Sequence, residues 1–264
     1  MSAAPIIELK DLCVHRTETI LNHIDWKVLP GENWIILGAN GAGKSTLLNS
    51  ITAYDCFSAG TLRIDGHTYG EYNWPELRRR IGFVSADLES RIKPAEPALD
   101  VIVGGYFASL GLYDEPSDKE YDKALDILAK IDCRELRNRA WGYLSQGEKR
   151  RVMIGRAMMV DPLLIILDEP CSGLDPVARE RLLRFLQNFS SDPAAPSLIM
   201  TTHHAEDIMP VFTHLLALKN GRVLRSGKIG EVMIDEIISE LFDAQIKVDL
   251  KNGRYHLNII SFKE

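Results

Sequence analysis

The sequence predicts an α/β fold with a mostly parallel sheet, extended by antiparallel strands near the N-terminus and by helices in the middle of the chain. Two continuous apolar runs, "LLIIL" at 163–167 and "SLIM" at 197–200, follow prolines, and such runs are typical of strands buried on both faces of a parallel sheet. A third run, "WIIL" at 34–37, leads into a glycine-rich turn and a helix. The chain has 264 residues, 45% of them hydrophobic, which is ample for a buried core.

Half-buried antiparallel strands are expected near the N-terminus, because apolar and polar positions alternate there. The apolar positions are Ile7 and Leu9, followed by Ile24, Trp26 and Val28. A further short strand is predicted at "GTLRIDG", residues 60–66.

Helices are predicted in the middle of the chain. The segments "EPALDVIVGGYFASLGLY" (96–113) and "SDKEYDKALDILAKI" (117–131) both predict helices, and Ser117 with Glu120 forms a capping box at the start of the second. This helical pattern interrupts the α/β core from about residue 88 to 143.

The residue pattern changes again after residue 230. "EIISELFDAQ" (236–245) predicts a helix, and two alternating runs around Asn252-Gly253 predict a β-hairpin, for which Asn-Gly is the strongest short signal. We therefore expect a main domain over 1–230 and a small C-terminal α+β extension over 231–264.

Composition excludes several classes of function. The formal net charge is −6, and the basic runs 78–80 and 149–151 are read as solvated helix faces, so no nucleic-acid partner is expected. The chain shows no signal peptide and no apolar stretch of the ~20 residues that span a bilayer, so we expect a cytoplasmic protein. The four cysteines, Cys13, Cys56, Cys133 and Cys171, lack paired or CxxC spacing, which argues against disulfides and zinc.

A phosphate-binding loop follows the strand at 34–37. "GANGAGKS" fits GxxxxGK[ST] between a strand and a helix, where glycines let backbone N–H groups converge on phosphate oxygens. Lys44 would neutralise phosphate charge, and Ser45 would supply an oxygen to Mg²⁺. The residues expected to bind the nucleotide here are Gly38, Ala39, Asn40, Gly41, Ala42, Gly43, Lys44, Ser45 and Thr46.

Two carboxylates follow the apolar run at 163–167. Asp168 lies where a parallel strand would meet the phosphate loop, so it reads as a metal ligand for Mg²⁺. Glu169 follows directly, and a carboxylate beside the terminal phosphate can accept a proton from the attacking water as general base.

Two histidines, in "TTHH", follow the apolar run at 197–200. One of them could hydrogen-bond a terminal phosphate and hold the attacking water, while the alternative is a surface pair at a helix start.

Five motifs in order, "GANGAGKST", "LSQGEKRR", "LLIILDEP", "SGLD" and "TTHH", resemble the nucleotide-binding domain of ATP-binding cassette (ABC) proteins over about residues 6–230. The resemblance implies a P-loop NTPase fold with a RecA-like core, an antiparallel β-subdomain and an α-helical subdomain inserted at about 88–160. It also implies ATP and Mg²⁺ as ligands. "LSQGE" is similar to the signature LSGGQ, so Ser145, Gln146 and Gly147 are expected to face a γ-phosphate.

The resemblance also places residues of the remaining motifs. His203, rather than His204, matches the switch histidine and is expected to be catalytic together with Glu169. The loop that would touch a partner subunit comprises Ser172, Gly173, Leu174 and Asp175.

Three positions depart from the family pattern. Where an aromatic residue usually stacks on adenine, the chain offers Arg16 or His15; a guanidinium plane can stack on a base, and a solvated arginine is the alternative. Ala86 occupies the place of a glutamine that reaches the metal and the transport partner, and Asp87 is its candidate replacement as a metal ligand. Glu148 replaces the last glutamine of the signature.

The resemblance favours an ATP-hydrolysing subunit that works as a head-to-tail homodimer and drives a separate membrane permease, which would hold it at the inner face of the cell membrane. Details such as the "GFVSADL" loop are similar to the molybdate-transport-type subset. The alternative function is a soluble, non-transport ABC ATPase that acts by ATP-driven dimerisation as a regulatory, ribosome-associated or repair protein.

Overall fold

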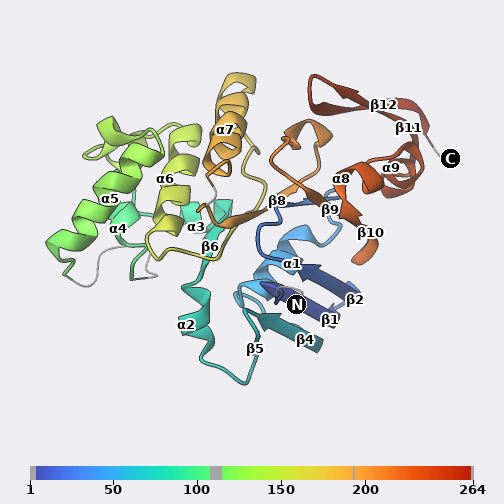
Figure 1. The fold of residues 1–264 in the computed structure, drawn as a ribbon, viewed down its shortest axis with the longest axis horizontal. Coiled ribbons are helices and arrows are strands. Elements are labelled where there is room, and N and C mark those ends of the chain that lie inside the picture. The colour runs from blue at the N-terminus through green and yellow to red at the C-terminus, as the bar shows by residue number, and fades with distance from the viewer. Residues whose placement is uncertain (1–3, 108–114, 193, 263–264) are drawn as a thin grey trace. The chain divides into compact units, whose positions relative to one another are not determined.

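The computed structural model describes residues 4–107, 115–192 and 194–262, and the chain divides into two compact units (Figure 1). The first unit combines residues up to Leu77 with those from Ser197 onward, and the second comprises Arg78–Pro196. Among the described residues, no helix has both the length and the apolar character needed to cross a membrane.

An antiparallel sheet in the first unit has the strand order β2-β1-β4-β5. Its strands are β1 (Ile7–His15), β2 (Thr19–Val28), β4 (Ala59–Ile64) and β5 (His67–Thr68). The alternating positions predicted from the sequence are buried, and Ile7 pairs with Val28 and Leu9 with Trp26. Both N-terminal strands and the strand predicted within 60–66 are therefore confirmed.

The second sheet of this unit carries the phosphate loop. Strand β3 (Trp34–Leu37) lies between two parallel neighbours, β8 (Ser197–Thr202) and β9 (His214–Lys219), and β10 (Arg222–Lys228) runs antiparallel to β9. Strands β3 and β8 are buried along their whole length, as continuous apolar runs predict. Helix α1 (Lys44–Ile51) follows β3 through the glycine-rich turn.

The C-terminal extension belongs to the same unit. It consists of the short helix α8 (Ile229–Val232), helix α9 (Asp235–Phe242) and the hairpin of β11 (Ala244–Lys251) and β12 (Arg254–Phe262). The turn residues Asn252 and Gly253 have φ of 51° and 74°, the left-handed values that a two-residue hairpin turn requires. Helix α9 ends before the predicted boundary because Asp243 is left-handed, with φ of 53°.

The second unit contains two parallel strands, β6 (Ile81–Val84) and β7 (Leu164–Leu167), and most of the helices. Figure 1 shows three helices side by side, α4 (Ala98–Val103), α5 (Asp118–Lys130) and α6 (Gln146–Met158). The remaining elements here are α3 (Ala86–Ser90), the 3₁₀ turns at Arg134–Leu136 and Trp141–Tyr143, and α7 (Pro176–Phe189); α2 (Trp74–Arg78) lies at the boundary of the units.

The two helices predicted in this region have different outcomes. The capping box of Ser117 and Glu120 is present at the start of α5, so that prediction is confirmed. The first helix is shorter than expected, because α4 ends at Val103, before Gly104 and Gly105. Residues 108–113 of the predicted segment lie outside the described residues.

Candidate functional site

The phosphate loop leaves the start of α1 without a side-chain cap. Gly43 is the N-cap residue, with φ of 100°, and it has no side chain that could accept a hydrogen bond from the first turn. The first N–H groups of a helix have no partner within the helix and lie at the positive end of its dipole. This helix start therefore has the donor set that suits a phosphate.

Two glycines of the loop are required by close approaches. A Cβ built at Gly38 would lie 2.3 Å from the carbonyl oxygen of Leu218, and one at Gly43 would lie 2.8 Å from Cδ2 of Leu21. At Gly38 the obstacle is backbone, so a side chain there would displace the loop. At Gly43 the leucine side chain could move, but the φ of 100° would strain any residue other than glycine. Asn40 and Gly41 are exposed at its tip, where a ligand can reach them.

Lys44 is buried within its own loop. Its Nζ donates hydrogen bonds to the carbonyl oxygens of Gly38, at 2.9 Å, and Ala39, at 3.1 Å, and the residue is only 5% exposed. The next residue, Ser45, is exposed, so its hydroxyl is accessible from solvent. The loop thus offers one ammonium group, one hydroxyl and a set of backbone N–H groups in a single turn.

The strand that leads to the histidines is hydrogen-bonded to this loop. The N–H of Gly38 donates to the carbonyl of Thr202 at 3.4 Å, so the start of the loop lies beside the residue that precedes His203. The hydroxyl of Thr202 donates to buried Asp207 at 2.6 Å and accepts the N–H of His204 at 3.0 Å. These bonds fix the backbone on both sides of His203, which is half-buried, whereas His204 is exposed.

Arg16 lies in the turn between β1 and β2 and is held by an ion pair. Its guanidinium contacts the carboxylate of Asp55, while His15 makes a 2.9 Å hydrogen bond with the hydroxyl of Thr19. Arg16 is 57% exposed, so it can leave Asp55 when a base is available for stacking. The base-stacking role of Arg16 stays a prediction.

The candidate carboxylates of the second unit follow β7. The N–H of Asp168 donates to the carbonyl of Val84 at 2.9 Å, which extends the β6–β7 pairing by one residue. Glu169 has a left-handed backbone, with φ of 44°, and its carbonyl accepts the N–H of Ser172 at 3.0 Å. A non-glycine residue in this conformation costs about 1–3 kcal/mol and is often associated with functional sites.

Asp87 lies in the first turn of α3. Ser85 caps this helix by accepting the N–H of Leu88 at 3.3 Å, and Asp87 makes an exposed ion pair with Arg91 at 2.6 Å. Ala86 beside it is also exposed. The structure therefore presents the Asp87 carboxylate at the surface of its unit, with a cation that a metal ion would have to replace.

The turn that carries the predicted signature, residues 144–148, is called the signature turn here. It differs from the phosphate loop because its own side chains cap the helix that follows, α6. The N–H of Ser145 donates to Oε2 of Glu148 at 2.6 Å, and the hydroxyl of Ser145 accepts the N–H of Glu148 at 3.4 Å. Partial burial raises the pKa of Glu148, but the bonds from Ser145 and the charge of Arg139 outweigh it and hold the pKa below its usual value. The Glu148 carboxylate thus turns back onto the helix start, while Gln146 is exposed and Gly147 half-buried.

The following loop has a similar cap. The Asp175 carboxylate accepts the N–H groups of Val177 and Ala178, at 2.8 and 3.0 Å, and so begins α7. Ser172 and Gly173 are exposed and Leu174 is half-buried. The loop therefore presents small polar groups at the surface of its unit.

A buried ion pair joins three functional segments of the second unit, and the sequence did not reveal it. The guanidinium of Arg150 contacts the carboxylate of Glu89 from α3, and its Nε donates to the carbonyl of Pro170, directly after Glu169, at 3.1 Å. Arg150 is 4% and Glu89 8% exposed, so the prediction of a solvated run at 149–151 is wrong for Arg150. Burial raises the pKa of Glu89, and the charge of Arg150 opposes this.

Comparisons with known proteins agree with this geometry. The family model described as "ABC transporter" matches residues 21–172. The uncharacterized ABC transporter ATP-binding protein YlmA of Bacillus subtilis (strain 168) is 44% identical over 245 residues, which cover 92% of this chain and 93% of YlmA.

Two solved structures are similar along most of the chain. One is cbiO1 from Clostridium perfringens, described as part of the ABC transporter complex cbiONQ, with 25% identity, a TM-score of 0.76 and coverage of 89% of this chain and 93% of that chain. The other is the ATP-binding cassette MJ0796, solved as a dimer in a post-hydrolysis state bound to ADP and Pi, with 26% identity, a TM-score of 0.72 and coverage of 84% and 98%.

Proposed function

Because this chain belongs to the ABC transporter family and is a nucleotide-binding ATPase, we propose that it is the ATP-hydrolysing subunit of an ABC transporter. Two copies would form a head-to-tail dimer that drives a separate membrane permease. The observation that supports this most is the start of α1, where a glycine N-cap, a buried lysine and an exposed serine provide a phosphate site.

In the proposed reaction, the backbone N–H groups of the loop hold the phosphates of ATP, and Lys44 exchanges its carbonyl partners for phosphate oxygens. Glu169 accepts a proton from the attacking water as that water approaches the γ-phosphate. His203 donates a hydrogen bond to the γ-phosphate, and the backbone bonds around Thr202 keep it in position. The products are ADP and inorganic phosphate.

Magnesium fits the donors that these residues supply. The Ser45 hydroxyl and the Asp168 carboxylate are oxygen ligands of the kind Mg²⁺ prefers, and Asp87 is a third candidate after its ion pair with Arg91 opens. When bound, the ion would neutralise charge that develops on the phosphates. Arg16 would support the adenine by stacking.

The single copy of each motif supports the dimer that we propose. Ser145, Gln146 and Gly147 of one copy would contact the γ-phosphate held by Lys44 of the other, and Asp175 would lie at the contact between copies. Closed two-fold symmetry then gives two equivalent sites. The dimeric cassette bound to ADP and Pi supports this arrangement by similarity.

We further propose that residues 1–230 form the catalytic domain and 231–264 an extension, and that a permease holds the dimer at the inner face of the membrane. The relatives described above are named as ATP-binding proteins or as part of a transporter complex, which supports a permease over a soluble role. One observation favours the soluble alternative. The glutamine that usually couples the site to a permease is replaced here by Ala86 or Asp87.

The deciding experiment is purification of the chain from its own cells in mild detergent. We expect a multi-span membrane protein to accompany it in stable proportion and to resist a high-salt wash. A chain that elutes alone, or with soluble partners only, would support the non-transport ATPase instead.

A further inference from the structure

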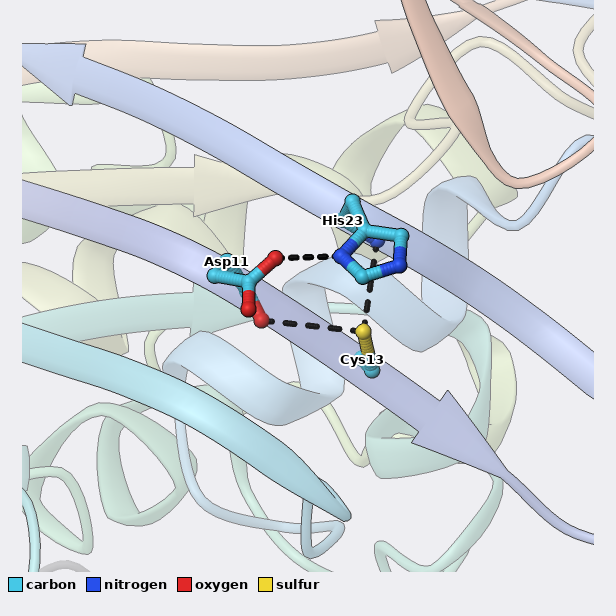
Figure 2. Close-up of side chains that lie close together, drawn as sticks. All are labelled: Asp11, Cys13 and His23. Atoms are coloured by element: carbon cyan, nitrogen blue, oxygen red, sulfur yellow. Dashed lines mark hydrogen bonds and ion pairs between the residues drawn. The ribbon is translucent and has the colours of Figure 1, made fainter.

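A cluster of three metal-ligating side chains lies on the β1–β2 hairpin, outside the phosphate loop. Asp11 and Cys13 come from β1 and His23 comes from β2 (Figure 2). One ligand atom from each residue lies within 4.8 Å of the others, and within the described part of the chain no other such group occurs. These residues have no part in the function proposed above.

The backbone around the cluster is irregular in a way that brings these side chains together. The β1–β2 register shifts between Leu9 and Leu12 and again between Leu12 and Val14. Asp11 and His23 both have φ of 53°, a left-handed conformation that is uncommon for residues other than glycine but is enriched in Asp and His. The N–H of Asp11 donates to the carboxylate of Asp25 at 2.9 Å, which holds the distortion in place. Bulges of this kind re-aim side chains.

The side chains form two layers. The imidazole Nδ1 of His23 contacts the Asp11 carboxylate, and these side chains are 65% and 66% exposed. Cys13 is buried beside them, and its sulfur accepts the N–H of His23 at 3.3 Å (Figure 2). This N–H group is the kind of donor that stabilises a thiolate ligand, whereas the thiol itself donates to the carbonyl oxygen of Asp11 at 3.6 Å, a bond that it would lose on binding an ion.

We propose that Asp11, Cys13 and His23 bind one zinc-class divalent ion. Sulfur, nitrogen and carboxylate oxygen are the ligands that Zn²⁺ takes, whereas Mg²⁺ prefers oxygen alone. Bonds of about 2.0–2.3 Å in a tetrahedron place ligand atoms about 3.3–3.8 Å apart. The direct contact between His23 and Asp11 must therefore open to admit the ion, and any longer distance within the cluster must close. Both exposed side chains can make these movements by rotation. The thiol proton is released to solvent on binding, and water fills the fourth position.

The sequence spacing argued against zinc because no CxxC pair occurs. The three ligands instead are Asp11 and Cys13, with one residue between them on β1, and His23 on β2. Only the register of the hairpin brings His23 beside the other two. The bound ion would link β1 to β2 below the turn that carries Arg16.

The test uses untagged full-length protein, stripped with a chelator and kept without nucleotide. Titration with Zn²⁺ against a chromophoric competitor should show one equivalent bound, and Co²⁺ should give a thiolate-to-cobalt charge-transfer band. Cys13→Ser should abolish the band, and His23→Gln and Asp11→Asn should each weaken binding by at least about tenfold. Cys56→Ser and His15→Gln, an exposed cysteine and a neighbouring histidine, are the matched controls and should bind as the parent does.

The exposed positions keep the test decisive if Cys13→Ser does not fold, because Asp11→Asn and His23→Gln alter surface side chains only. Circular dichroism in chelator checks that each variant is folded. The proposal is overturned by the absence of stoichiometric binding, by a charge-transfer band that Cys56→Ser removes, or by His23→Gln and Asp11→Asn binding as tightly as the parent.

Discussion

The helices α1 and α6 both begin at a glycine-containing turn that the sequence predicts to bind phosphate, yet their first turns differ. Helix α1 has a glycine cap that forms no side-chain hydrogen bond, and its first turn contains no acidic residue. Helix α6 is capped by Ser145 and Glu148 from within its own unit. The phosphate loop is thus built as a site in its own right, whereas the signature turn is stable without a ligand and suits a contact made only when two copies meet.

The largest effect is expected on ATP hydrolysis, the step to which the starts of α1 and α6 would both contribute. Glu169→Gln removes the proposed base but keeps the shape of the side chain, so ATP hydrolysis should fall by about 10²–10⁴-fold. ATP should then hold two copies together, which size-exclusion chromatography with ATP would detect. Glu236→Gln, at an exposed position of α9, is the control. Turnover near the parent rate would assign the base to another group.

Much of this arrangement could be predicted because it is local. The loop at Gly38–Ser45, the capping box at Ser145 and the Asn252-Gly253 turn each depend on a few neighbouring residues. The Arg150–Glu89 pair joins residues 61 positions apart, and a run of three cations on a helix gives no sign that one of them is buried. The same applies to Arg16, whose partner Asp55 lies 39 positions away.

The buried pair anchors α6, so breaking it should be the largest structural change. Arg150→Met leaves the Glu89 carboxylate buried without its cation, which should lower the free energy of unfolding by about 3–5 kcal/mol. Urea unfolding followed by tryptophan fluorescence measures this. Glu89→Leu combined with Arg150→Met should recover most of the loss, because no buried charge remains.

The control for that pair is an exposed one. Arg184→Met breaks an ion pair with Glu180 in which both side chains are more than 40% exposed, so it should change the stability by less than about 1 kcal/mol. Equal losses for Arg150→Met and Arg184→Met would show that the buried pair does not anchor the helix.

Lys44→Ala tests the phosphate loop as a site that acts without a partner. Removing the ammonium should weaken nucleotide binding by a single copy and lower hydrolysis by about 10²–10³-fold. Binding of a fluorescent ATP analogue to dilute protein isolates the single copy from the dimer. Lys119→Ala, an exposed lysine of α5, should bind and hydrolyse ATP as the parent does.

Ser145→Ala tests the other helix start, and Ser117→Ala is its matched control because both serines belong to capping boxes. Each variant should lose about 1 kcal/mol of stability. Only Ser145→Ala should weaken the ATP-held dimer, measured by light scattering in the Glu169→Gln background, and both should leave nucleotide binding by a single copy unchanged. If the two variants dimerise equally well, the signature turn does not contact nucleotide.

The smallest effect is expected at Glu148, whose carboxylate either caps α6 or faces the nucleotide. Its pKa is lowered in the folded chain, so its share of stability is present above the ordinary value of 4.5 and is lost as the pH falls through the lower folded-state pKa. Glu148→Gln keeps the capping geometry but loses the charge, so it should cost about 0.5 kcal/mol at pH 7 and nothing in acid. Unfolding curves at both pH values measure this.

The same variant separates the capping role from a role at the nucleotide. Since the carboxylate is turned back onto Ser145, the ATP-held dimer should form with the same affinity whether residue 148 is glutamate or glutamine. If Glu148→Gln strengthened the dimer by tenfold or more, the carboxylate would be facing the phosphates of the partner. The signature turn would then carry a repulsive charge that the phosphate loop, with no acidic residue in the first turn of α1, does not have.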